Sequence, residues 1–300
     1  MFVCTQTPPL MESNSILSVM LPVALGIIML GLGLSLTLAD FKRVVVYPKA
    51  VLIGLVCQMM ILPVLCFVIA INFGLPPELA VGLMLLSASP GGPTANLYSH
   101  LAKGDVALNI TLTAVNSLLT LFTLPFIVNF SIRYFLESGQ AIPMQFQKVM
   151  EVFIIVLVPV TIGMLIKSKN AALSVKLDKP VRILSAIFLA LIIAAAVIKE
   201  KQNVATYFEK VGTAALVFNI LSMMLGYYIP ILFRLGKKQA IAIGMEIGIH
   251  NGTLAIYIAL TVLGNSTMSI PPAIYSLIMF FTAAAFGFLV NRKGKNPPLI

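Results

Sequence analysis

Charged residues are scarce in this 300-residue sequence. Asp, Glu, Lys and Arg together make up 10% of it, whereas soluble domains contain about 25%. Hydrophobic residues make up 59%, and the mean hydropathy is +1.03. Because so little polar sequence remains, a large water-soluble domain is excluded, and the composition indicates a membrane protein.

Residues that carry common enzyme chemistry are also few, with three cysteines and two histidines. Cys4, Cys57 and Cys66 have neither metal-like nor disulfide-like spacing. The sequence contains no HExxH motif and no P-loop, and its loops are too short for an ATPase domain. We therefore expect neither an enzyme nor a nucleotide-driven pump, and no cofactor.

Long hydrophobic runs fill most of the chain, at about the 20 residues that a helix needs to cross a bilayer. The runs are continuously apolar and do not alternate, so they predict helices and not a β-barrel. The sequence thus predicts an all-α polytopic membrane protein with nine transmembrane helices, approximately Ile16–Leu38, Ala50–Phe73, Leu79–His100, Val106–Phe130, Val149–Ile166, Ile183–Ile198, Val211–Phe233, Gln239–Gly264 and Pro272–Asn291.

The net charge of +10 is distributed unevenly between the two sides of this nine-helix arrangement. Fifteen of the twenty Lys and Arg residues fall in alternate loops, and the other side receives only Arg133, Lys148, Lys199, Lys201 and Lys210. The positive-inside rule then places the N-terminus outside and the C-terminus in the cytoplasm. The basic charge is a topology signal, so the expected partner is the lipid bilayer, here of a bacterial inner cell membrane, and not nucleic acid.

Only one acidic residue, Glu246, lies deep inside a predicted span. It belongs to the stretch IGMEIGIHNG, where Gly244, Gly248 and Gly252 flank His250 and Asn251. An ionisable group at this depth is costly and tends to mark an ion or substrate pathway. Glycines permit the helix to unwind, so we expect a helix break around Gly248 and Gly252.

A second break is predicted in the third span, within the stretch SASPGGPTAN. Pro90 and Pro93 bracket Gly91 and Gly92 there, and this combination stops a helix. Both interrupted spans come next to last in their half of the chain, and they cross the membrane in opposite senses. Paired discontinuous helices in an inverted repeat are typical of secondary transporters, where backbone groups at the breaks bind ions and substrate.

The predicted organisation follows from this inverted repeat. It consists of an extracytoplasmic tail, a first repeat of four helices, a connecting loop, a second repeat of five helices and a cytoplasmic tail. Their boundaries are 1–15, 16–130, 131–148, 149–291 and 292–300.

Several motifs, in order and at matching spacing, resemble the bile acid:sodium symporter family over about residues 17 to 292. They are LGIIMLGLGLSLTLADF in the first span, CQMMILP in the second, SPGG and AN in the third, KGDVALN before the fourth and EIGIHN in the eighth. The resemblance implies a core domain and a panel domain, two broken helices that cross in the core, and sodium-coupled uptake of an organic anion.

The same resemblance implies two sodium sites, built from oxygen atoms that suit a hard cation. The first would use Asn96, Asn109, Thr113 and Glu246. The second would use Gln58, Glu246 and oxygens of Ile247, Ile249 and His250. Asn116 shares a helical face with Thr113 and could serve either the ion site or helix packing.

Thr94, His250 and Asn251 are the expected substrate contacts, because they lie at the breaks. The chain departs from the family at His250, where a glutamine is usual, and imidazole nitrogen is a poor sodium ligand. We expect a monomeric sodium symporter for a bile-acid-like anion or a small carboxylate. The alternative is a proton-coupled organic-anion carrier on the same fold that uses Glu246 and His250.

Overall fold

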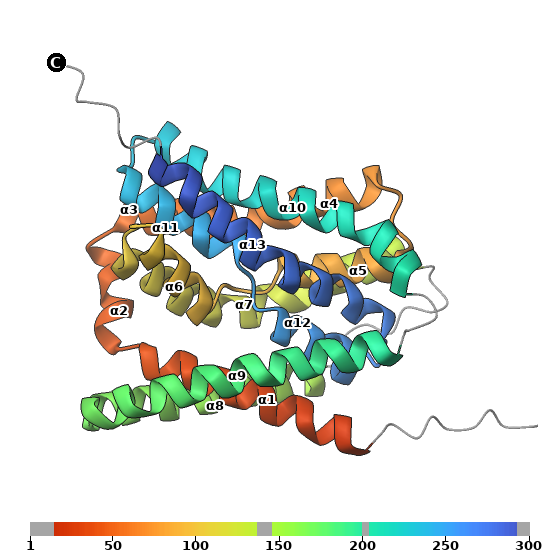
Figure 1. The fold of residues 1–300 in the computed structure, drawn as a ribbon, viewed down its shortest axis with the longest axis horizontal. Helices are drawn as coiled ribbons and strands as arrows, with labels where there is room; N and C mark the ends of the chain where they lie inside the picture. Colours follow the sequence, from red (N-terminus) through yellow and green to blue (C-terminus); the bar gives the residue numbers. More distant parts are fainter. Residues whose placement is uncertain (1–14, 137–145, 200–203, 293–300) are drawn as a thin grey trace, which may run out of the picture.

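The computed structural model describes residues 15–136, 146–199 and 204–292, and in these residues the protein is all helical (Figure 1). The outer predicted tails lie largely outside the described residues. The first half contains α1 Ser15–Ser35, α2 Leu38–Lys42, α3 Pro48–Val56, α4 Leu62–Asn72, α5 Pro77–Ser87, α6 Pro93–Leu101 and α7 Val106–Phe135. The second half contains α8 Phe146–Lys169, α9 Ala171–Lys199, α10 Val204–Leu232, α11 Lys237–Gly248, α12 Gly252–Tyr257 and α13 Ile270–Arg292.

Short irregular turns connect or extend several of these helices. The π-helical turn Cys57–Ile61 joins α3 to α4, and the π-helical turn Ile258–Val262 extends α12. The two 3₁₀ turns are Arg43–Val45 and Thr267–Ser269.

Six helices in the described residues are long and apolar enough to cross a membrane alone, and a bent pair brings the number to as many as seven. Each of the nine hydrophobic stretches named above contains helix, so the helical class of the fold is confirmed. The arrangement of nine spans stays a prediction. Large apolar side chains such as Phe126, Leu232 and Phe281 are more than three-quarters exposed, as expected for residues that face lipid.

The helices form two groups, which are separated in Figure 1. α1 packs against α8 and α9, and these three helices lie together along the lower edge of the view. In the other group, α10 packs against α11 and α13, and α5 packs against α7 and α4. We call α1, α8 and α9 the three-helix unit, and the remaining helices the main bundle.

Glycines hold the three-helix unit together at very short range. A Cβ atom added to Gly33 of α1 would overlap the backbone of Val160 in α8, and one added to Gly163 of α8 would lie 2.6 Å from the carbonyl oxygen of Leu30. Small residues at such positions let two membrane helices approach closely. The α1–α8 contact therefore leaves no room for a side chain at Gly33 or Gly163.

Some helices end at residues other than those predicted, because polar side chains cap the helix there. The first span was expected to reach Leu38, but α1 ends at Ser35 and the chain bends by 71° into Leu38–Val45. At the bend, the backbone N–H and hydroxyl of Thr37 both donate to Asp40 Oδ2, at 2.6 and 2.7 Å. This side-chain cap starts a new helix at Leu38.

The sixth span is longer than its apolar run. α9 begins at Ala171, well before the predicted start at Ile183, because polar residues support its first turns. Asn170 Oδ1 accepts from the backbone N–H of Leu173 at 2.9 Å, and Asp178 and Arg182 form an i,i+4 ion pair. Capping and an intrahelical pair of this kind stabilise a helix without any apolar face.

The two interrupted spans are the most deeply enclosed part of the protein. An 18-residue stretch of the span Lys237–Val262 is 94% buried inside the protein, against 22% for a stretch of the same length in Gln147–Lys169 of α8. α5 is likewise buried at every position from Leu79 to Ser87. α5 and the span that carries Glu246 therefore lie inside the bundle and not against lipid, whereas α6 has exposed residues such as Leu97 and Leu101.

Candidate functional site

The two helix breaks meet each other in the middle of the main bundle. The first is the non-helical segment 88–92 between α5 and α6, and it contains Pro90, Gly91 and Gly92. The second is the segment 249–251, with Gly248 ending α11 and Gly252 beginning α12. The backbone N–H of Asn251 donates to the carbonyl of Pro90 at 2.8 Å, and His250 Nδ1 lies 2.9 Å from the carbonyl oxygen of Ser89. The breaks are thus bonded to one another directly.

Carbonyl groups freed by the breaks are taken up by neighbouring side chains. The Ser89 carbonyl also accepts from Gln58 Nε2 at 3.0 Å. The Gly248 carbonyl accepts from Asn219 Nδ2 at 2.8 Å and from the Tyr275 hydroxyl at 2.9 Å. Buried carbonyls need such partners, so Asn219 and Tyr275, which were not predicted as site residues, serve the break.

Glu246 lies just before the second break and is fully buried. Its Oε2 accepts from Thr113 Oγ1 at 2.6 Å, and its Oε1 accepts from Asn116 Nδ2 at 3.1 Å. Gly91 of the other break faces the same carboxyl group, since a Cβ added there would lie 2.6 Å from the Glu246 carboxyl carbon. Among the described residues, no ion pair includes Glu246.

The other three side chains predicted for the first sodium site are linked to this carboxylate through Thr113. Thr113 Oγ1 lies 3.0 Å from the carbonyl oxygen of Asn109 and 3.3 Å from Asn96 Oδ1, in addition to its contact with Glu246. Asn109 Nδ2 donates to the Ala242 carbonyl in α11 at 2.7 Å. The structure therefore brings Asn96, Asn109 and Thr113 together with Glu246, from α6, α7 and α11.

Oxygen atoms without hydrogen-bond donors are concentrated here. The buried oxygens Asn109 Oδ1, Asn116 Oδ1 and Gln58 Oε1 have no partner. The single hydroxyl hydrogen of Thr113 can serve one acceptor fully, and the carboxylate is the nearest of three. Orphaned buried oxygens cost free energy unless a ligand supplies positive charge or a donor. The arrangement fits a cation that takes oxygen ligands.

The chemistry of the cluster also limits which cation fits. In the described part of the chain, no group of three or more His, Cys, Asp or Glu residues could hold a metal ion. One carboxylate with carboxamide and hydroxyl oxygens is instead suited to a hard cation of low charge.

The residues predicted for the second sodium site are only partly joined. Gln58 lies in the π-helical turn Cys57–Ile61, a helix irregularity that is frequent at functional sites. Gln58 and His250 meet at the Ser89 carbonyl. The backbone N–H of Ile249 returns to the Met245 carbonyl, while Ile247 belongs to α11. No hydrogen bond among the described residues joins either Gln58 or His250 to Glu246.

His250 is fixed by its surroundings. Its ring stacks on Phe218 with centroids 5.9 Å apart and meets the edge of Tyr275 at 5.4 Å. Nδ1 faces a carbonyl oxygen, so it is the donor, while Nε2 is buried and has no partner.

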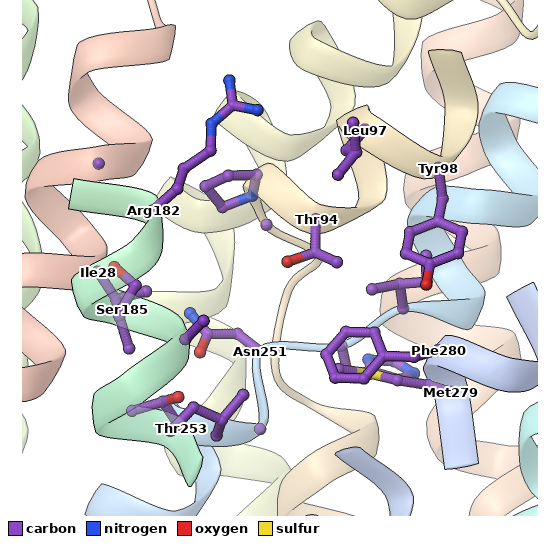
Figure 2. Close-up of a pocket in the computed structure, with 18 residues that line it drawn as sticks. Ile28, Thr94, Leu97, Tyr98, Arg182, Ser185, Asn251, Thr253, Met279 and Phe280 are labelled. Atoms are coloured by element: carbon purple, nitrogen blue, oxygen red, sulfur yellow. The ribbon is translucent and has the colours of Figure 1, made fainter. Parts of the chain in front are cut away.

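A pocket of about 360 Å³ lies between the three-helix unit and the breaks (Figure 2). Thr94, His250 and Asn251, the predicted substrate contacts, all line it. Asn251 Oδ1 also caps α12 by accepting from the Leu254 N–H at 3.0 Å. Most of the remaining wall is apolar, and it includes Leu97, Leu189, Met279 and Phe280. The pocket can thus hold a small molecule with an apolar body next to polar groups at the breaks.

The model of the Sodium Bile acid symporter family matches residues 22–207. The uncharacterized sodium-dependent transporter YocS of Bacillus subtilis is 28% identical over 274 residues, which cover 91% of this chain and 84% of that protein. The hepatic sodium/bile acid cotransporter of Rattus norvegicus is 27% identical over 271 residues, 90% of this chain and 73% of that protein.

A plant relative is similar over a comparable length. The probable chloroplastic sodium/metabolite cotransporter BASS2 of Oryza sativa subsp. japonica is 24% identical over 273 residues. These cover 91% of this chain but 64% of the rice protein.

Proposed function

Because this chain belongs to the sodium bile acid symporter family, we propose that it is a secondary active transporter that couples sodium to the movement of an organic anion. The relatives are named as sodium-dependent transporters or as cotransporters of bile acid or metabolites. Transport in the proposed mechanism is by alternating access, with the main bundle as core and the three-helix unit as panel.

The observation that carries this proposal is the cluster around Glu246. A fully buried carboxylate without an ion pair in the described residues, in a cluster that contains the unpartnered oxygens of Asn109 and Asn116, supports a cation site. We assign the coupling sodium to Glu246, Thr113, Asn96 and Asn109, and add Asn116 because it contacts the carboxylate directly. Gln58 supplies a further free oxygen beside the first break.

The site and the pocket share the two breaks, which gives a physical basis for coupling. Gly91 lies against Glu246, and the next residue, Gly92, lines the pocket. His250 and Asn251 line the same pocket just after the end of α11, which carries Glu246. A cation that orders the breaks would therefore also order the polar groups that face an anion, and each ligand would favour binding of the other.

The test needs no knowledge of the substrate. The purified protein is heated in nanodiscs with increasing sodium chloride, and with choline chloride at matched ionic strength. We expect sodium alone to raise the melting temperature, because a bound ion stabilises the folded state by about 2.7 kcal/mol at a hundred times its dissociation constant. Glu246→Gln should remove this response.

Uptake in proteoliposomes then tests transport itself. Taurocholate and pyruvate serve as the bulky and the small probe anion, each measured with an inward sodium gradient and with none. Equal stabilisation by sodium and choline, together with gradient-independent uptake, would refute sodium coupling. His100→Gln, which changes an exposed residue at the end of α6, is the control.

The proton-coupled alternative is not favoured. His250 is wedged between Phe218 and Tyr275, and its Nδ1 donates to a carbonyl. The residue is only 2% exposed, and this burial disfavours a charged imidazolium.

A further inference from the structure

The pocket between the three-helix unit and the breaks has one charged side chain in its wall, Arg182 of α9. The rest of the lining is apolar or uncharged, and the positive charge therefore stands out. In Figure 2 the Arg182 side chain leaves α9 and rises to the end of the pocket away from Thr253. It is half exposed, so it lies at the mouth and not in the interior.

Arg182 is held by a carboxylate of its own helix. Nε donates to Asp178 Oδ1 at 3.1 Å, and Nη2 lies 2.7 Å from Asp178 Oδ2. Two parallel contacts of this kind are the geometry in which a guanidinium recognises a carboxylate. Asp178 occupies the Nε–Nη2 edge of the guanidinium. A second carboxylate can contact the N–H groups of Nη1, but it must compete with Asp178 for a two-point contact on the Nε–Nη2 edge.

The lining and the volume of the pocket indicate the chemical nature of the rest of the bound molecule. Leu97, Leu189, Met279 and Phe280 form an apolar wall between the mouth and the breaks. The volume of about 360 Å³ is near the small end of ligand pockets, which run from about 300 to 1,000 Å³. One cation and an apolar wall fit a molecule with a single anionic group at one end and an apolar body.

We propose that Arg182 is the residue that recognises the anionic group of the substrate, and that the substrate is a small amphipathic monocarboxylate. The carboxylate binds the guanidinium at the mouth while the apolar body fills the pocket toward the breaks. Asp178 acts as a tethered competitor that holds the fork when the pocket is empty. This inference rests on the proposed transport of an organic anion and names its recognition group.

Two substitutions with opposite expected effects test the proposal. Arg182→Gln should weaken binding of the probe 4-phenylbutyrate at least ten-fold, because the charged partner is lost. Asp178→Asn should tighten it several-fold, because the competing carboxylate is lost. Arg182→Lys keeps the charge without the fork and should lie between wild type and Arg182→Gln. Lys179→Gln, an exposed residue beside Asp178 that is not in the wall, should change nothing.

The measurement is the dissociation constant of 4-phenylbutyrate in nanodiscs, with sodium present. On wild type, the neutral amide of the same acid should bind at least ten-fold more weakly than 4-phenylbutyrate. On Arg182→Gln, the amide and the carboxylate should bind equally well. If the ion pair only stabilised α9, Arg182→Gln and Asp178→Asn would act in the same direction. That result, or no binding of 4-phenylbutyrate to wild type, would overturn the proposal.

Further arms separate related outcomes. If 4-phenylbutane sulfonate binds more strongly than 4-phenylbutyrate, the recognised group is a sulfonate. This result would refute the proposal that the substrate is a monocarboxylate. A different result is carboxylate binding that depends on Arg182 but is equal in sodium and in choline. That result would refute sodium coupling and would still support the role of Arg182 in recognising the anion.

Discussion

Glu246 is a costly residue for the interior of this protein, and its neighbours show how the cost is offset. Thr113 and Asn116 donate to its two oxygens, yet their hydrogen bonds are neutral and supply no positive charge. The adjacent orphaned oxygens would repel an additional anion and attract a cation. A site of this kind is most stable with its ion bound.

His250→Gln should make the dependence of uptake on sodium steeper. The imidazole offers the site only an unpartnered nitrogen, whereas a glutamine amide places an oxygen near Gln58. We expect a first-order sodium dependence in wild type and a higher order in the variant, measured as initial uptake of the probe anion against sodium concentration.

The same measurement repeated at several pH values tests the protonation of His250. Because its ring is buried and should stay neutral, wild type and variant should share one pH profile. His100→Gln is the matched control at the protein surface. An unchanged sodium order would leave His250 without a role in coupling, and a pH response lost only in the variant would restore the proton-coupled alternative.

At this scale the sequence predicted the residues that are unusual for a lipid-buried helix. Glu246 could be proposed from its depth in an apolar span, whereas Thr113 and Asn109 were proposed from the family resemblance. Arg182 could not, because in the sequence it is one basic residue among several at a helix end. Tyr275 and Asn219 were not predicted either, since their partner is a carbonyl that only the folded break exposes.

At the scale of elements, the two breaks behave as one structure. Gly91 and Gly92 are adjacent but have different surroundings. A Cβ on Gly91 would collide with Glu246, whereas one on Gly92 would meet nothing within 4 Å, and Gly92 has an extended backbone that any residue adopts.

Gly91→Ala should therefore raise the sodium concentration needed for half-maximal stabilisation by at least ten-fold, because the methyl group displaces the carboxylate. Gly92→Ala should leave it unchanged. Gly92→Leu should spare sodium binding but weaken binding of the probe anion, because the longer side chain enters the pocket. Thermal stability against sodium and against 4-phenylbutyrate separates these effects, and identical behaviour of the two alanine variants would argue against the close approach.

The sequence predicted helix existence better than helix ends. Glycine marked both breaks and proline also marked the first, since the effect of these residues on the backbone is local. The end of α1 depends on Thr37 and Asp40, and the start of α9 depends on Asn170, which are polar contacts that a hydropathy pattern does not contain.

At the scale of the whole molecule, the distribution of basic residues makes a topology prediction. In a variant with all three native cysteines replaced, Lys169→Cys should react with an impermeant maleimide only in inside-out vesicles. Arg133→Cys should react only from the outside of intact cells. Both positions are exposed in the structure. Labelling of both from one side would contradict the predicted orientation.

The hydrogen bonds that join the two breaks have a consequence for the direction of transport. Because the Asn251 N–H and His250 Nδ1 donate to residues of the other break, the ion site should keep its shape while the three-helix unit moves past it. A site of constant shape binds sodium equally well from either face. On the proposed mechanism we therefore expect no built-in rectification, and reversing the two concentration gradients should run the transporter backwards at a comparable rate.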